Sequence, residues 1–196
     1  MAREAFDREQ VPVWDLFVRV FHWMMVALVA TAFLSPDKKS LHEPVGYAVL
    51  GLVLARLAWG IIGTRHARFS DFVARPATVL AYLKALRRGA AQRYLGHNPA
   101  GGAMILALLG TLVIVTVSGW LSETDRFFGV DWVSLLHHVS AHLLLLLIGG
   151  HLLGVIVSSV LHGENLVVAM ITGRKSVRLE GEHESGTAAR SFGGAD

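Results

Sequence analysis

Hydrophobic residues along this chain gather in four long, nearly continuous runs. The runs cover about Leu16 to Leu34, Val45 to Ile62, Ala103 to Leu121, and Trp132 to Leu161. A bilayer core about 30 Å thick requires roughly 20 helical residues to cross it, and each run is of about this size or longer. None of the runs alternates polar and apolar positions as the strands of a membrane barrel do. The pattern therefore predicts an all-α protein, a bundle of four transmembrane helices.

Composition supports a membrane protein and restricts its cofactors. Of the 196 residues, 53% are hydrophobic and 17% charged, which is too apolar for an ordinary soluble domain. The chain has no cysteine, which excludes disulfides, cysteine-based zinc or iron–sulfur sites and covalently attached c-type haem. Any cofactor is therefore held non-covalently. The triplet at Ala30 to Ala32 resembles a signal-peptide cleavage site, but the segment before the first run is long and mixed in charge, so we expect this run to be retained.

Basic residues are concentrated between the second and third runs. Against one acid, Asp71, this connection carries Arg65, Arg68, Arg75, Lys84, Arg87, Arg88 and Arg93. By the positive-inside rule, the connection and both chain termini are expected on the cytoplasmic side of the membrane. The other two loops then face outwards. The loop with Glu123, Asp125 and Asp131 is net acidic, which suits a basic partner or is ordinary solvated surface.

The connection from Thr64 to Ala100 has structure of its own. Apolar residues recur in it at roughly helical spacing beside the basic residues: Phe72, Val73, Val79, Leu80, Leu83 and Leu86. This spacing predicts an amphipathic helix on the inner membrane surface, with a cytoplasmic cap packed on the bundle as the alternative. We assign residues 1–175 to one transmembrane domain, and residues 176–196, rich in Gly, Ser and Glu, to a disordered tail.

Four histidines lie in or beside the last apolar run, in "LLHHVSAHLLLLLIGGHLLGV" at residues 135–155. Ionisable residues inside a membrane are functional candidates, because they are unfavourable there without a partner. At about 100° per residue, His137 and His151 share one face of the helix and lie about 21 Å apart along it. His138 and His142 share a different face, and we expect them to be polar residues near the outer rim or partners of haem propionates.

Histidines on the first two runs match this spacing in depth. His22 lies near the inner end of the first run and His42 near the outer start of the second, so depth pairs His22 with His151 and His42 with His137. Two opposed imidazoles without a carboxylate or thiolate suit haem iron, but leave zinc short of its usual four ligands.

Glycines lie close to both predicted pairs. Gly46 follows His42 by one turn, and Gly149 and Gly150 precede His151. These positions leave room for a flat macrocycle, or for close packing of helices.

Two arginines and the remaining histidines complete the set of polar candidates. Arg19 and Arg56 either extend to the inner interface or neutralise haem propionates. His162 is expected in solvent at the inner surface. His66, His97 and His183 lie outside the runs and carry no functional signal.

Several short motifs resemble one family. The segments "RVFHW" at 19–23, "LHEPVGY" at 41–47, and His137 followed by "HLLGV" at 151–155 resemble bacterial cytochrome b561 and hydrogenase-type b cytochromes. The segments "RLAWGIIGTRHARFSDF", "GHNPAGG" and "ENLVVAMITGRK" resemble the hydrogenase-type branch. The resemblance covers about residues 12–175, and His138 departs from it, since a Glu is expected after His137.

The resemblance implies four transmembrane helices and two b haems, with ligands on the first, second and fourth helices. Carried over to this sequence, the axial ligands are His22, His42, His137 and His151. The expected function is that of an electron-transfer subunit of an oxidoreductase, working between the membrane quinone pool and a redox protein such as a c-type cytochrome or a hydrogenase. The quinone pocket is expected near one haem at a membrane surface, and no nucleic-acid partner is expected.

Other functions remain open from the sequence. They are a stand-alone quinone oxidoreductase, a histidine-lined transporter for a metal or protons, and a structural anchor for a peripheral enzyme.

Overall fold

A computed structural model describes residues 8–178. Four of its helices are long and apolar enough to cross a membrane: α1 (Leu16–Leu34), α2 (Lys39–Ile62), α5 (Pro99–Ser122) and α6 (Asp131–His162). The predicted all-α bundle of four spans is therefore confirmed.

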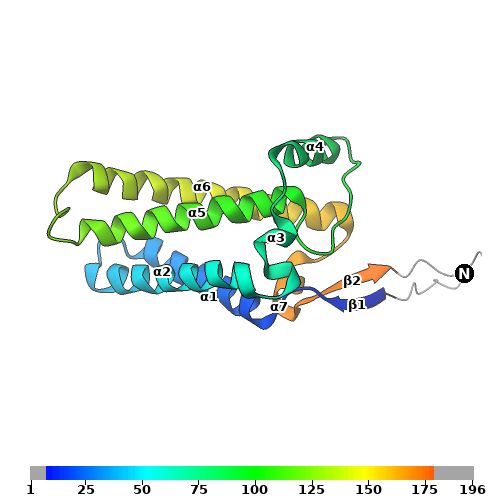
Figure 1. Ribbon diagram of the computed structural model, residues 1–196, viewed down its shortest axis with the longest axis horizontal. Coiled ribbons are helices and arrows are strands. Elements are labelled where there is room, and N and C mark those ends of the chain that lie inside the picture. The colour runs from blue at the N-terminus through cyan, green and yellow to red at the C-terminus, as the bar shows by residue number, and fades with distance from the viewer. Residues whose placement is uncertain (1–7, 179–196) are drawn as a thin grey trace, which may run out of the picture.

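The four spans pack as two hairpins. α1 lies against α2, α5 lies against α6, and contacts between α2 and α5 join the two hairpins. Figure 1 shows them side by side along the long axis of the molecule. A cluster of buried hydrophobic residues lies between the hairpins and consists of Met25, Val45, Val49, Val53, Leu112 and Leu144.

Two spans begin earlier than their apolar runs. α2 begins at Lys39 rather than Val45, since the helix continues through Pro44 and loses only the one hydrogen bond that proline cannot donate. α5 begins at Pro99 rather than Ala103. The Asn98 side chain accepts a hydrogen bond from the Gly101 N–H at 2.7 Å, and proline suits the first turn of a helix. Because α2 begins at Lys39, His42 lies in its first turn.

The two ends of the bundle differ in construction. At one end, which we call the loop end, short connections at residues 35–38 and 123–130 join the helices. The other end, the strand end, carries the smaller elements (Figure 1). These are β1 (Arg8–Pro12), η1 (Arg65–Ala67), α3 (Phe69–Phe72), α4 (Pro76–Arg87), α7 (Leu166–Thr172) and β2 (Arg174–Arg178).

Both ends of the described chain meet at the strand end. β1 pairs antiparallel with β2, and the Gly173 carbonyl accepts hydrogen bonds from the N–H groups of Val13 and Trp14 at 2.8 and 3.0 Å. Gly173 has a φ of 80°, a conformation that glycine adopts without strain. The first and last described segments are thereby tied to each other.

The predicted tail needs one correction. Residues 176–178 were expected to be disordered, but they belong to β2, and Gln10 Nε2 donates to Ser176 Oγ at 2.8 Å. Pairing with the N-terminal strand supplies hydrogen bonds that this polar segment lacks alone. The rest of the predicted tail, residues 179–196, lies outside the described residues.

The long connection between α2 and α5 forms η1, α3 and α4. One side of α4 packs on the protein through Tyr82, which is buried with its ring centre 5.9 Å from that of Tyr94. On the other side, Leu80 and Leu83 are exposed. A cap on the bundle and an amphipathic helix are therefore compatible descriptions of α4.

Candidate haem-binding sites

The first histidine pair joins α1 to α6 near the strand end. The ring centres of His22 and His151 lie 6.3 Å apart, with an angle of 55° between the ring planes. His22 is in the second turn of α1, and His151 is in the second half of α6. The structure therefore brings together the residues that were paired by depth.

The second pair joins α2 to α6 near the loop end. The ring centres of His42 and His137 lie 6.1 Å apart, and their planes are 78° apart. His42 is in the first turn of α2, and His137 is in the second turn of α6. Both pairs thus place one imidazole of α6 opposite one imidazole of the other hairpin, at two depths.

These separations fit haem ligation. A metal–nitrogen bond of about 2 Å, plus about 1 Å from the nitrogen to the ring centre, puts two imidazoles on opposite sides of an iron about 6 Å apart. Binding to one iron would not require the two ring planes to be parallel, so both observed angles would be acceptable. Their role as ligands stays a prediction, but the geometry of the residues fits it.

The loop-end imidazoles are oriented by backbone carbonyls. His42 Nδ1 lies 3.1 Å from the Ala32 carbonyl oxygen, and His137 Nδ1 lies 3.0 Å from that of Val115. Since a carbonyl only accepts, each Nδ1 carries the proton and each Nε2 keeps a free lone pair. Such hydrogen bonds fix the tautomer and orientation of a ligating histidine.

The strand-end pair lacks these bonds. His22 Nδ1 is buried and has no hydrogen-bond partner among residues 8–178. Its ring instead stands edge-on to Trp23, with ring centres 5.1 Å apart. His22 is therefore held by packing, whereas His42 and His137 are held by hydrogen bonds.

Two glycines bear on the loop-end pair in different ways. A Cβ at Gly119 would lie 3.0 Å from His137 Cε1, so glycine at this position lets the imidazole approach α5. A Cβ at Gly46 would meet no atom within 4 Å, so no neighbouring helix packs closely on it. The room at Gly46 fits a macrocycle better than it fits close helix packing. No pattern in the sequence indicates the importance of Gly119, because only the fold places it beside His137.

The comparison with known families settles the class of protein. The family model for prokaryotic cytochrome b561 matches residues 13–173 of the 196. The chain belongs to this family. No curated protein and no solved structure matches it. The protein is accordingly a membrane b-type haem protein of electron transfer. Membership of this family favours electron transfer over a transporter or a structural anchor.

The donor set of the cytochrome agrees with haem. Within residues 8–178, no group of three or more His, Cys, Asp or Glu side chains is placed to hold a metal ion. A zinc ion needs about four protein or solvent ligands. A haem iron needs only two from the protein, because the porphyrin supplies the rest.

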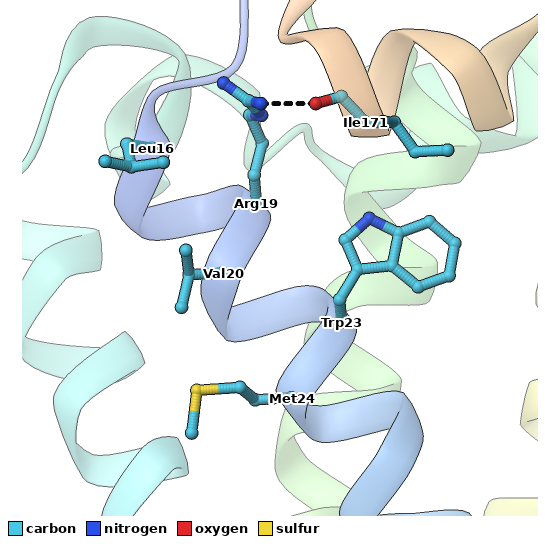
Figure 2. Close-up of a pocket in the computed structure, with 6 residues that line it drawn as sticks. All are labelled: Leu16, Arg19, Val20, Trp23, Met24 and Ile171. Atoms are coloured by element: carbon cyan, nitrogen blue, oxygen red, sulfur yellow. Dashed lines mark hydrogen bonds between the residues drawn. The ribbon is translucent and has the colours of Figure 1, made fainter.

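Arg19 lines an open, apolar groove beside the strand-end pair. The groove, of about 500 Å³, is lined by Leu16, Arg19, Val20, Trp23, Met24 and Ile171. In Figure 2, the Arg19 side chain reaches the Ile171 carbonyl oxygen, and the indole of Trp23 borders the groove one turn along α1. Arg19 Nε is buried without a partner in the described chain. Arg19 is therefore a cation at the edge of an apolar groove and close to His22.

Arg56 is enclosed by the connection after α2. It is 3% exposed, donates to the Ala67 carbonyl oxygen at 3.0 Å and lies over the Phe69 ring at 5.6 Å. The guanidinium points toward the strand end but does not reach solvent, since η1 and α3 cover it. Its Nη1 has no partner among the described residues. Its role toward a propionate stays a prediction.

His138 and His142 face away from both pairs. Each is exposed, and each donates from Nδ1 to the carbonyl four residues earlier, Ser134 and His138, at 2.7 Å. The structure does not bring them to an opposing histidine. Their roles, as polar residues near the rim or as partners of propionates, stay a prediction.

His97 is a buried polar residue whose burial the sequence does not predict. Its ring packs between Trp14 and Phe72, at ring-centre distances of 4.5 and 4.9 Å, and its Nδ1 is buried without a partner in residues 8–178. Burial, with the nearby charges of Arg56 and Lys175, lowers the pKa of His97 to about 3. His97 is therefore neutral at physiological pH. Its neighbours come from segments far apart in the chain, so no local pattern announces its burial.

Proposed function

We propose that this cytochrome is a di-haem electron carrier between the membrane quinone pool and a redox protein. The observation that carries the proposal is the pair of opposed histidine couples at two depths, with ring centres 6.3 and 6.1 Å apart. His22 and His151 would hold one haem, and His42 and His137 the other. Along α6, the two ligand positions are about 21 Å apart, so the haems lie toward opposite membrane surfaces.

Each bound haem supplies a one-electron redox centre. The residues of the chain set its surroundings. Ala32 and Val115 carbonyls fix two of the imidazoles, and the hydrophobic core between the hairpins keeps water away from the space between the two sites. A dry, rigid path of this kind favours electron transfer through the bundle over reaction with solvent.

We place the quinone in the groove beside His22. The groove opens to lipid, where the quinone tail resides, and Arg19 offers N–H donors for a quinone carbonyl. Trp23 joins the groove wall to the His22 ring. The quinone would thus meet the strand-end haem without leaving the membrane.

We place the redox protein at the loop end, next to the other haem. Asp125 and Asp131 are exposed there, whereas Glu123 is paired with Lys39. A c-type cytochrome or a hydrogenase with a basic surface would match the unpaired acids. The cations of the strand end favour a cytoplasmic position for that end in an inner membrane, so the loop end would face outwards.

A reduced-minus-oxidised absorption spectrum of the purified protein, with pyridine haemochrome quantitation, tests the proposal. We expect two b haems per chain, and the loss of one on changing any of His22, His42, His137 or His151 to alanine. His138→Ala is the matched control, because it adjoins His137 but faces elsewhere. A single haem in the unaltered protein, or loss of haem from His138→Ala alone, would refute the assignment.

A second experiment concerns the partner. Co-purification of a c-type cytochrome or a hydrogenase supports the subunit function, while quinone turnover by the isolated protein with a small oxidant supports a stand-alone oxidoreductase.

A further inference from the structure

The outer face of α4 combines exposed leucines with cations. Leu80 is 59% exposed and Leu83 is 40% exposed. At about 100° per residue, Leu80, Leu83, Lys84 and Arg87 fall within an arc of about 100° on the helix. Tyr82, on the opposite side, is buried and anchors α4 to the protein. The arc of four residues, which we call the α4 outer face, therefore has no protein partner in residues 8–178.

The cations of this region are not neutralised by the protein. Among the described residues, no salt bridge involves Lys84, Arg87, or the flanking Arg75 and Arg88. Arg93, further along the same connection, is by contrast paired with Glu164. Four cations on and beside α4 are thus without a salt bridge in the described chain.

The depth of α4 determines what this face meets. α4 packs on α5, and Figure 1 shows it beside the strand end of α5 and α6. With the spans across a membrane, their strand ends would leave the hydrocarbon layer here, which would put α4 at the level of the lipid headgroups. A lipid surface is present there whenever the spans are in a membrane.

We propose that the α4 outer face binds anionic phospholipid headgroups. Leu80 and Leu83 enter the boundary between headgroups and acyl chains, and Lys84 and Arg87 contact lipid phosphates. This division of apolar and basic residues on one helical face is that of helices that lie in the membrane interface. The contact would hold the connection, and with it the cover over Arg56, against the bilayer. The inference does not depend on haem or quinone.

The absence of cysteine makes a direct test available. Leu83→Cys in the full chain carries a single thiol for an environment-sensitive fluorophore such as NBD. After reconstitution, we expect bluer and stronger emission in vesicles of phosphatidylcholine with phosphatidylglycerol than in phosphatidylcholine alone. Ala81→Cys, exposed on another side of α4, is the matched control and should show a smaller change.

Charge variants in the Leu83→Cys background test the role of the cations. Lys84→Gln with Arg87→Gln should raise the fraction of phosphatidylglycerol needed for the half-maximal change by about fivefold or more. Lys38→Gln, which removes an exposed cation at the loop end, should leave that fraction unchanged. Retained helical circular dichroism shows that each variant is folded.

Two outcomes would overturn the inference. One is the same emission from Leu83→Cys in both lipid mixtures. The other is a change that appears only on adding an acidic polypeptide such as polyglutamate, which would assign the face to a protein partner.

Discussion

The two histidine pairs have nearly equal separations but different surroundings. At the loop end, His42 and His137 each donate a hydrogen bond to a backbone carbonyl of a neighbouring helix. At the strand end, His22 Nδ1 has no such partner in the described chain, and its ring packs against Trp23. Equal spacing is therefore reached in two ways, by hydrogen bonds within the spans and by packing.

The strand end has its own polar contacts, which join the ends of the spans to the segments that connect them. Asp15 caps α1 and also accepts hydrogen bonds from Trp59 and Thr64, while His97 packs under Trp14. These contacts join segments that are distant in sequence. We therefore expect the two sites to respond separately to substitutions. The loop-end site depends on groups in the spans, and the strand-end site depends on these contacts between distant segments.

The largest effect is expected at the loop end, from Gly119→Ala. The new Cβ would lie 3.0 Å from His137 Cε1 and 3.1 Å from its Nδ1, so the ring would have to leave the Val115 carbonyl. We expect the protein to lose about half of its haem, because ligand orientation fails at one site only. Gly110→Ala, on the same helix with open space around it, should keep both haems. Loss of haem in both variants, or in neither, would contradict this.

Asp15→Ala tests the strand end. The carboxylate accepts from the Val18 N–H at 2.8 Å, the Trp59 indole at 3.1 Å and the Thr64 hydroxyl at 2.5 Å. Loss of a helix cap and of two further hydrogen bonds should cost about 2–3 kcal/mol. In thermal melts followed by haem absorbance, we expect the His22–His151 site to fail first. Asp125→Ala, at an exposed loop-end position, should melt like the unaltered protein.

The pH dependence of Asp15 has a definite sign. Burial alone would raise the pKa of Asp15, but hydrogen bonds from Thr64, Val18 and Trp59 leave it below its ordinary value. A carboxyl group whose pKa is lowered on folding stabilises the fold above its unfolded pKa, near 4. This contribution is lost as the pH falls through the folded pKa, so Asp15→Ala should lose less stability than the unaltered protein on acidification below about pH 4.

The sequence was sufficient for the spans and for the pairing of the histidines. Four apolar runs fix the helices, and helical phase with depth pairs His22 with His151 and His42 with His137. The groups that orient or cover these residues were not predictable. Gly119 and His97 act through contacts between segments that only tertiary packing brings together. The β1–β2 pairing was missed for the same reason, since neither strand has an apolar pattern of its own.

His97→Phe should change the acid sensitivity of the strand end. Its pKa is about 3 in the folded protein, against about 6.5 when unfolded, so the unfolded state takes up a proton first as the pH falls. Stability is full above about pH 6.5 and falls by about 1.4 kcal/mol per pH unit on acidification toward pH 3.

Phenylalanine keeps an aromatic ring between Trp14 and Phe72 but does not titrate. The melting temperature of His97→Phe should therefore depend less on pH between 6.5 and 4. His66→Phe is a control of the same chemistry, since His66 is only partly buried and is bonded to Asp71 at 3.0 Å. An unchanged pH slope in His97→Phe would show that His97 takes up its proton in the folded state.

Arg19→Gln is expected to have the smallest effect, on the reduction potential of one haem. Arg19 is one turn from His22, and a nearby cation favours the reduced state of a haem. Glutamine retains a donor for the Ile171 carbonyl but removes the charge. We expect the reduction potential of the strand-end haem to fall by tens of millivolts. For a one-electron centre, about 59 mV corresponds to a tenfold change in the equilibrium constant.

A spectroelectrochemical titration of the two haems measures this difference. The loop-end haem should keep its potential in Arg19→Gln, and Lys38→Gln should leave the strand-end haem unchanged. Equal shifts of both haems would contradict separate control of the two sites. As haem ligands, His42 and His137 would be made stronger donors by their hydrogen bonds and would favour oxidised iron, whereas Arg19 would favour reduced iron at the other end. We therefore predict the higher potential at the strand end, and electrons that enter at the loop end would then move energetically downhill toward the groove beside His22.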